Sequence, residues 1–246
     1  MDLWTLTRRA AKRIGAQIDV SSDYEISIIA DDVSVRPLKA VRGLRTAVRQ
    51  YWSKKLLDSP HQGRIARGVA LDNSKDMAKL ISCRTVLPIK DWRAVDQARL
   101  DILPLRGYPW SCTPSKACRR CGQTPENGLH VISNCIVALP MKTKRHNDVQ
   151  KLLCDLLRSS GYEATTNRAI SGQRLIPDII SLAGSPILFD ITIPYDVPEN
   201  LENAFKLKVE KYQHLGRILP LVVGALGSWC PRNDDIRSLL GISGRD

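Results

Sequence analysis

Four metal-binding side chains are crowded into the middle of the chain. They follow the pattern Cys118-x2-Cys121-x8-His130-x4-Cys135. Two cysteines three positions apart on a tight turn can direct both thiolates at one ion, and Gly122 permits such a turn. His130 and Cys135 can return from a short loop to complete a tetrahedron. Protein ligands would then fill all four positions, so the pattern predicts a closed, structural zinc module.

The other cysteines are interpreted differently. Cys112 could replace one of the four ligands, whereas Cys83, Cys154 and Cys230 lie in apolar patterns typical of core residues. The sequence has seven cysteines, and its start lacks the apolar segment of a secretory signal. We therefore expect a reducing compartment inside the cell, where such a cluster binds metal rather than forming disulfides.

The charge balance indicates a polyanionic partner. The formal net charge is +12 and the isoelectric point is about 9.6, which favours nucleic acid over a merely solvated basic surface. Residues 111–151 hold seven Lys and Arg but only two Asp and Glu, so a zinc-stiffened loop there suits contacts to phosphates. No apolar run approaches the roughly 18 residues of a membrane span. The predicted phosphate contacts include Arg119, Arg120, Lys142, Lys144 and Arg145.

Hydrophobic periodicity predicts a mixed α/β fold. From residue 143 onward the order is helix, three strands, helix and strand, which indicates a compact α/β domain of about 100 residues. Upstream, strand fragments at 18–20 and 24–28 precede several helix candidates. The expected helices are 36–57, 74–81, 89–103, 143–159, 201–215 and a short one capped by Asn233 or Asp234; the expected strands are 162–169, 175–182, 187–193 and 219–226, with a turn at 184–186.

Two aspartates stand out in the predicted strands. Asp178 begins one strand and Asp190 lies within the next. Neighbouring strands are about 4.8 Å apart, so the two carboxylates could converge on one cation. Acids among apolar residues are costly unless they are paired or hold a metal. Two carboxylates with a lysine are what metal-assisted phosphodiester hydrolysis needs, although Pro-Asp beside a strand and lysines on a helix are common without any such role.

In this order, the motifs resemble the C-terminal part of a polyprotein from site-specific non-LTR retrotransposons, of the clade that inserts into ribosomal RNA genes. In that family a Cys-Cys-His-Cys zinc knuckle precedes a restriction-like endonuclease of the PD-(D/E)xK type. The resemblance covers about 110 residues well and reaches back more weakly to about residue 36. The resembling segments are Leu103-Pro104-Leu105-Arg106-Gly107, Cys118-Arg119-Arg120-Cys121, 129–135, 144–149, Pro177-Asp178, 190–193, Lys208 and Lys211-Tyr212.

The resemblance implies a role for each residue of the carboxylate group. Asp178 and Asp190 would bind Mg²⁺. Lys208 would be the catalytic lysine, moved from the usual strand onto the following helix. Lys211 and Tyr212 would complete that helix face. Structural Zn²⁺ and catalytic Mg²⁺ are therefore the expected cofactors.

The resemblance also implies an activity and partners. Arg145 and His146 would contact DNA near the cleaved strand. The endonuclease would nick target DNA in the nucleus, and the new 3′ hydroxyl would prime reverse transcription of the element RNA. The parent polyprotein would also be an RNA-directed DNA polymerase.

Three departures from the family pattern favour a rival interpretation. Thr192 stands where the usual motif has a lysine, Ile176 replaces a common basic residue, and the third acidic ligand is open between Glu163 and Glu202. The alternative is a non-catalytic zinc-knuckle module that binds nucleic acid beside a decayed nuclease domain. A weaker alternative is a zinc-stabilised protein-interaction domain.

The expected domain order follows from these motifs. Residues 1–35 are unassigned and could be the remnant of an upstream polymerase region. Residues 36–110 form a helical linker, 111–140 the zinc knuckle and 141–246 the restriction-like endonuclease. Asp31-Asp32 faintly resembles a polymerase metal motif, but we interpret it as the start of a helix. Because no polymerase palm is visible, we expect a fragment, a truncated copy or a partial record of a longer polyprotein.

Overall fold

The chain forms two compact units, Met1–Pro60 and His61–Asp246. The computed structural model describes residues 3–20, 26–30, 33–35, 40–71, 88–170, 175–183 and 185–242. The helix expected at 74–81 and the side chain of Cys83 lie outside these residues. The range 36–110, expected as one linker, contributes helices to both units.

The first unit combines a small antiparallel sheet with two helices. The tight turn at Gly15, whose φ is +70°, connects the first helix to the first strand, and Ala11, Ala16 and Ile28 form the core between them. The strand predictions at 18–20 and 24–28 are confirmed with shifted ends. Asp31 and Asp32 lie outside the described residues, but a strand and not a helix follows them. The elements are α1 (Leu3–Arg13), β1 (Ala16–Val20), β2 (Ile26–Ala30), β3 (Val33–Val35) and α2 (Ala40–Asp58), with strand order β1-β2-β3.

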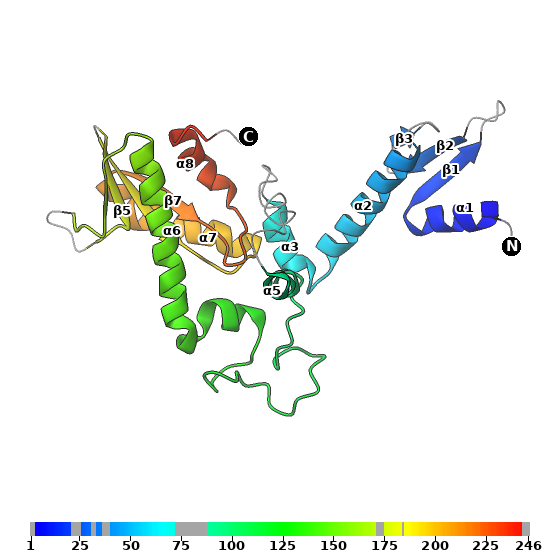
Figure 1. Ribbon diagram of the computed structural model, residues 1–246, viewed down its shortest axis with the longest axis horizontal. Coiled ribbons are helices and arrows are strands. Elements are labelled where there is room, and N and C mark those ends of the chain that lie inside the picture. Colours follow the sequence, from blue (N-terminus) through cyan, green and yellow to red (C-terminus); the bar gives the residue numbers. More distant parts are fainter. Residues whose placement is uncertain are drawn as a thin grey trace. The chain divides into compact units, whose positions relative to one another are not determined.

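The second unit is a mixed α/β body (Figure 1). Its four-stranded sheet has the order β4-β5-β6-β7, antiparallel from β4 to β6 and parallel between β6 and β7. The parallel pair is joined by a helical crossover, as parallel strands require. Its helices are α3 (Gly63–Ala70), α5 (Ile89–Arg99), α6 (Leu139–Ser159), α7 (Pro198–Tyr212) and α8 (Asp234–Leu239); its strands are β4 (Ala164–Thr166), β5 (Ile179–Ala183), β6 (Ser185–Thr192) and β7 (Arg217–Val222).

The alternation of side chains along β6 gives the sheet two buried faces. Phe189 and Ile191 join Leu153 and Leu157 of α6, together with Ile236 of α8, in the larger core. Leu188, one residue out of phase, packs on the other face with Ile180 and Tyr212 at the end of α7. Residue 190 shares the parity of residue 188, so the alternation assigns it to the α7 face. Both cores are apolar, so a buried acidic side chain on either face of the sheet is unusual.

Several expected boundaries are wrong by a few residues. Helix α5 ends at Arg99 rather than at 103, because Asp101 adopts a positive φ of 54°. The turn expected at 184–186 is tighter, since Ser185 and Pro186 already pair with Ala183 and Leu182. Strand β7 ends at Val222 rather than at 226. Asn233 precedes α8 without a side-chain cap; its amide instead binds the backbone N–H and carbonyl of Val222.

None of the helices in the described part of the chain combines the length and apolar character that crossing a membrane requires.

Candidate functional site

The four predicted zinc ligands come together in the second unit. One ligand atom from each of Cys118, Cys121, His130 and Cys135 lies within 4.8 Å of every other. Tetrahedral zinc, with bonds of about 2.0–2.3 Å, needs ligand atoms slightly closer than this limit. Cys112 is exposed and outside the cluster. A three-thiol, one-imidazole donor set at these separations fits Zn²⁺, and the four residues could hold that ion.

Local contacts orient the four candidate ligands. The turn at Gly122 has a φ of 71°, as the sequence predicts. The hydroxyl of Thr124 lies 2.7 Å from His130 Nδ1, and His130 Nε2 lies 3.2 Å from Cys121 Sγ. Backbone N–H donors lower the pKa of the Cys118 and Cys121 thiols, chiefly those of Cys121 and Gln123 respectively. Burial raises the pKa of Cys135, so the three thiols are not equivalent.

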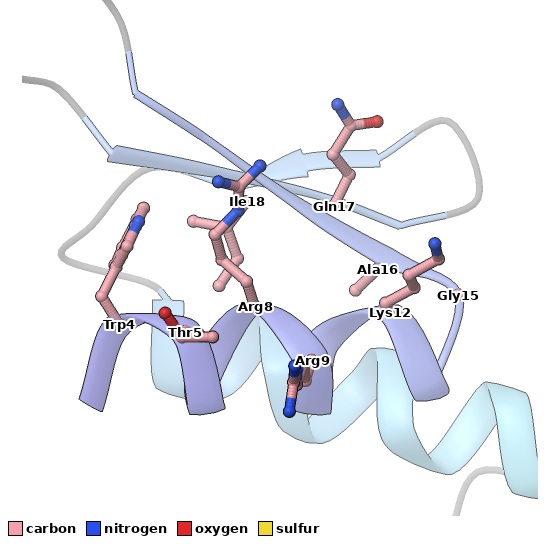
Figure 2. Close-up of a pocket in the computed structure, with 9 residues that line it drawn as sticks. All are labelled: Trp4, Thr5, Arg8, Arg9, Lys12, Gly15, Ala16, Gln17 and Ile18. Atoms are coloured by element: carbon pink, nitrogen blue, oxygen red, sulfur yellow. The ribbon is translucent and has the colours of Figure 1, made fainter. Parts of the chain in front are cut away.

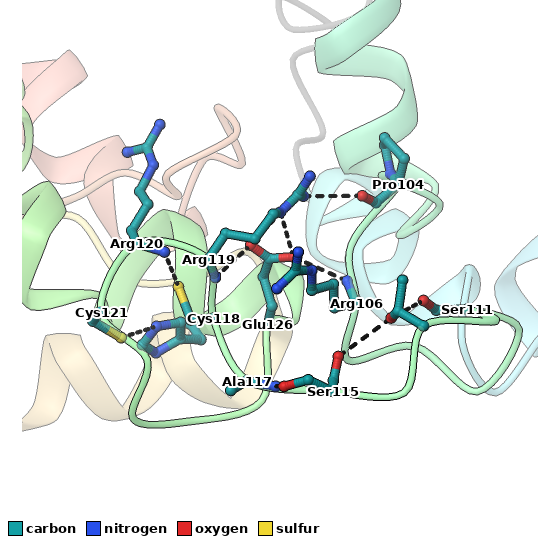
Figure 3. Close-up of polar contacts among 12 residues, drawn as sticks. Pro104, Arg106, Ser111, Ser115, Ala117, Cys118, Arg119, Arg120, Cys121 and Glu126 are labelled. Atoms are coloured by element: carbon teal, nitrogen blue, oxygen red, sulfur yellow. Dashed lines mark hydrogen bonds and ion pairs between the residues drawn. The ribbon is translucent and has the colours of Figure 1, made fainter.

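A buried glutamate ties residues 115–138, which contain the four candidate zinc ligands and are called the zinc loop below, to the preceding segment (Figure 3). Glu126 is only 2% exposed and accepts hydrogen bonds from Arg119 Nε at 2.8 and 3.0 Å and from the backbone N–H groups of Arg106 and Arg119. Burial alone would raise the pKa of this carboxyl, but these donors outweigh it and lower the pKa to about 2. Arg119, predicted to contact phosphates, is therefore also a structural partner of Glu126.

A second polar cluster joins the zinc loop to the sheet. The buried carboxylate of Asp101 accepts hydrogen bonds from the hydroxyls of Tyr108 and Tyr195. A Cβ at Gly128 would lie 2.6 Å from Tyr195 Oη and 3.0 Å from Asp101 Oδ1. Burial is the main cause of the raised pKa of both tyrosines. Only glycine leaves room at position 128 for this junction between the loop and the segment after β6.

The two predicted aspartates meet at neighbouring strands. Ile179 pairs with Phe189, so one step further along the antiparallel register places Asp178 opposite Asp190. Residues opposite each other in such a pair present side chains to the same face. Asp178 Oδ2 also accepts a hydrogen bond of 2.6 Å from the N–H of Ile191. The acids therefore lie beside each other.

Helix α7 brings a cation and a phenol to Asp190. Lys208 Nζ forms an ion pair with Asp190 Oδ2, an oxygen that is fully buried and lacks a hydrogen bond of normal geometry. Tyr212 is fully buried, and its hydroxyl donates a 3.1 Å hydrogen bond to the carbonyl of Ile176. Burial, followed by a hydrogen bond with Asp190, raises the pKa of Tyr212. Lys211 is exposed, with its ammonium 4.6 Å from the Tyr212 ring centroid.

Helix α6 approaches Asp178 from another side. His146 Nε2 lies 3.2 Å from Asp178 Oδ2 and 3.3 Å from the carbonyl oxygen of Ile191. Gln150 is buried and donates hydrogen bonds to the Asp178 carbonyl at 2.6 Å and to Asn167 Oδ1 at 3.0 Å. The pKa of Asp178 is raised, first by burial and then by the charge of Asp190 despite the Ile191 hydrogen bond. Two adjacent carboxylates, one with a raised pKa, suit a divalent cation.

Neither candidate for the third acid joins this group. The carbonyl of Glu163 accepts from Leu182, which lies four residues, or roughly 13 Å of strand, beyond Asp178. The carboxylate of Glu202 pairs with Lys206 and Arg232, each at 3.7 Å. Within the described residues the acidic set therefore consists of Asp178 and Asp190.

Known proteins resemble this chain over most of its length. Three sequences described as "Retrovirus-related Pol polyprotein from type-1 retrotransposable element R2", all from Popillia japonica, align with it. One is 27% identical over 224 residues, covering 82% of this chain and 45% of the relative; a second is 28% identical, covering 63% and 24%. The third is 24% identical, covering 82% and 49%. The chain is related in sequence to the R2 Pol polyproteins.

The chain spans about half or less of the length of these R2 relatives. No protein-family model matches it. The resemblance stated from the motifs is thus confirmed by whole-sequence similarity, and it supports a function derived from a retroelement.

The predicted nucleic-acid contacts of this chain differ in their exposure and their partners. Arg120 is exposed, Lys142 Nζ donates to the carbonyl of Ser133 at 2.9 Å, and Lys144 pairs with Asp148 at 2.6 Å. Arg145 is partly buried; desolvation lowers its pKa, and its Nε lacks a hydrogen bond in the described structure. His146 contacts Asp178 rather than standing free.

Sequence reasoning missed the residues that fix the two aspartates. Gln150 occupies an ordinary polar position in a helical pattern, and no sequence motif predicts the positive φ of 51° at Asn167. Asp196 is fully buried and accepts from the N–H groups of Leu226 and Ser228 at 2.6 and 2.8 Å. The one available signal was an acid next to apolar residues at position 196.

Proposed function

We propose that this chain is part of a retrotransposon Pol polyprotein and acts as a Mg²⁺-dependent DNA endonuclease that nicks target DNA in the nucleus to prime reverse transcription. In this proposal residues 141–246 form a PD-(D/E)xK-type domain and residues 111–140 a zinc knuckle. The observation that carries it is the position of Asp178 directly before β5, where the register continued by one step places it opposite Asp190, with Lys208 ion-paired to Asp190. Element RNA and target DNA are the proposed partners.

Asp178 and Asp190 would hold the Mg²⁺, since their adjacent carboxylates supply the hard oxygen ligands it prefers. When bound, the ion would neutralise charge on the scissile phosphate and lower the pKa of a water. The buried Asp190 Oδ2, whose partner in the described structure is the Lys208 ammonium, is an acceptor that such an ion could share. The Ile191 N–H holds the Asp178 carboxylate in place.

Lys208 would stabilise the additional negative charge that develops on the phosphate. Its side chain is about three-quarters buried, which strengthens its field relative to that of a solvated lysine. Tyr212, fixed by its hydrogen bond to the Ile176 carbonyl, would keep this end of α7 against the sheet. His146 would help to orient Asp178.

The zinc knuckle and the start of α6 would position the DNA. The exposed Arg120 and the α6 residues Lys142, Lys144 and Arg145 are the proposed phosphate contacts, and their affinity for DNA would fall with salt. The four zinc ligands would keep the loop rigid, so these charges need no ordering on binding.

The decisive test is nicking of a supercoiled plasmid that carries a ribosomal RNA gene segment. With Mg²⁺, we expect Asp178→Asn and Asp190→Asn to reduce the nicking rate by about 1,000-fold or more, because each removes a carboxylate ligand. The matched control is Asp155→Asn, since Asp155 is an exposed acid on α6 whose pairing with Arg158 spans 4.0 Å. Nicking that persists in Asp178→Asn would reject the site.

A non-catalytic nucleic-acid-binding module is the second candidate. It is favoured by the absence of a third carboxylate beside Asp178 and Asp190 among the described residues, where Gln150 stands instead. Wild-type protein that is folded, zinc-loaded and binds DNA but never nicks it with Mg²⁺ or Mn²⁺ would establish this alternative.

A further inference from the structure

The first unit contains a cavity that the endonuclease proposal does not use. It lies between α1 and β1 and has a volume of about 550 Å³, within the roughly 300–1,000 Å³ typical of ligand pockets. Figure 2 shows α1 on one side and β1 on the other. The lining residues are Trp4, Thr5, Arg8, Arg9, Lys12, Gly15, Ala16, Gln17 and Ile18.

Three of these side chains form one stripe on α1. Trp4, Arg8 and Lys12 are spaced by four residues, so they share a helix face. Figure 2 shows all three directed toward β1, whereas Arg9 points away from it. Trp4 is 42% exposed, so much of its surface is available. The stripe therefore offers one aromatic surface followed by two cations about 6 Å apart along the helix axis.

The surroundings of the stripe are strongly basic. Residues 3–18 include four Lys and Arg and no acidic residue. The nearest carboxylate on β1, Asp19, accepts a hydrogen bond from the N–H of Val20. Within the described ranges, no carboxylate forms an ion pair with Arg8 or Lys12. No carboxylate of the described residues therefore competes with a ligand for these two cations.

We propose that the cavity between α1 and β1 binds single-stranded nucleic acid, with one base stacked on Trp4 and neighbouring phosphates at Arg8 and Lys12. Aromatic stacking combined with a basic groove is how proteins hold unpaired strands without sequence preference. A base inside a duplex hides its faces between its neighbours, so only an unpaired base can stack on Trp4. Ala11 already packs in the core against Ala16, so that side of α1 is not free to enter a lipid surface.

This site goes beyond the proposed endonuclease and does not depend on it. Its residues belong to the unit Met1–Pro60, whereas Asp178 and Asp190 belong to His61–Asp246. Loss of nicking in Asp178→Asn would therefore leave the predicted strand binding unchanged. Conversely, a failure of strand binding would not bear on the nuclease.

The test is the affinity of the full chain for fluorescent oligouridylate and oligothymidylate of about 12 nucleotides, by anisotropy without added Mg²⁺. We expect Arg8→Ala/Lys12→Ala to weaken binding about tenfold. The slope of log K against log salt should fall in magnitude by about 1.4, since each phosphate contact to a single strand contributes about 0.7. Trp4→Ala should weaken binding about tenfold with an unchanged slope, because stacking releases no counterions.

The matched control is Arg45→Ala/Arg49→Ala on α2, two exposed arginines of the same unit with the same spacing. It removes the same charge and should change the affinity less than threefold. Equal effects of the two double variants would overturn the site in favour of general charge attraction. A duplex of equal length that competes as well as the single strand would also overturn it. Comparing the two oligonucleotides then distinguishes RNA from DNA as the ligand.

Discussion

The zinc loop and the carboxylate group are built in opposite ways. The four zinc ligands lie between residues 118 and 135 and are oriented by contacts inside the loop, such as Thr124 to His130. The carboxylate group instead takes Asp178 from the residue before β5, Asp190 from within β6 and Lys208 from α7. The first site lies within one short segment that a bound metal would hold together, whereas the second exists only after the whole sheet has folded.

The largest effect expected from this contrast is the response to zinc removal. Structural zinc contributes about 10–16 kcal/mol of apparent binding energy, so Cys135→Ser or a chelator should unfold the loop 115–138 locally. The sheet core around Phe189 contains no candidate zinc ligand and should keep its protection. Hydrogen exchange in the loop and in the sheet, together with the measured ratio of zinc to protein, tests both expectations. Cys112→Ser is the exposed-cysteine control. Loss of protection throughout β6 would show that the two regions fold as one.

A smaller effect separates two lysines on the same helix. Lys208→Gln should slow nicking about 100-fold, or about 2.7 kcal/mol, because it removes the charge beside Asp190 while keeping a donor there. Lys211→Gln should change the rate less than threefold, since Lys211 is exposed and stacks on the Tyr212 ring. The measurement is the single-turnover rate at which each variant nicks the supercoiled plasmid. Similar losses in both variants would indicate that α7 acts only through general attraction of DNA.

The junction between the two regions can be tested at a glycine. Gly128→Ala places a Cβ against the hydroxyls of Tyr195 and Tyr108 and the carboxylate of Asp101, so it should lower the free energy of unfolding by about 2–3 kcal/mol. Gly122→Ala has open space around it and only the cost of a positive φ, about 1 kcal/mol. Urea unfolding of both variants ranks them. The reverse order would mean that the Asp101 cluster does not join the loop to the sheet.

The same contrast explains how much the sequence could predict. The zinc ligands were predicted individually, because local spacing alone determines which side chains can meet. Asp178 and Asp190 were also predicted, because a hairpin places residues at known registers and the hydrophobic alternation marked the strands. Gln150, Asn167 and the Asp101–Tyr195 contact were not, because they join positions 17 to 94 residues apart. No local periodicity in the sequence predicts such contacts, and none predicts the hydrogen bonds of the buried Asp196.

The smallest expected effect concerns the anchor of the zinc loop. Its ligands are local, but Glu126 accepts four hydrogen bonds, three from Arg119 inside the loop and one from the backbone of Arg106 before it. The pKa of this carboxyl is about 2 against an ordinary value of 4.5. A depressed pKa means that the carboxylate stabilises the folded state above about pH 4.5 and that this contribution is lost as the pH falls toward 2.

Glu126→Gln should therefore lower the free energy of unfolding by about 2 kcal/mol at pH 7, and the difference from wild type should shrink as the pH falls below about 4.5. Urea unfolding across this range measures it, and the comparison is restricted to pH values at which both proteins keep their bound zinc. Glu163→Gln, at an exposed position, should change stability by less than about 0.5 kcal/mol at every pH. A difference that does not change with pH would mean that Glu126 stabilises the loop by packing rather than by its charge. The charge of Glu126 would then not anchor the zinc loop to the preceding segment.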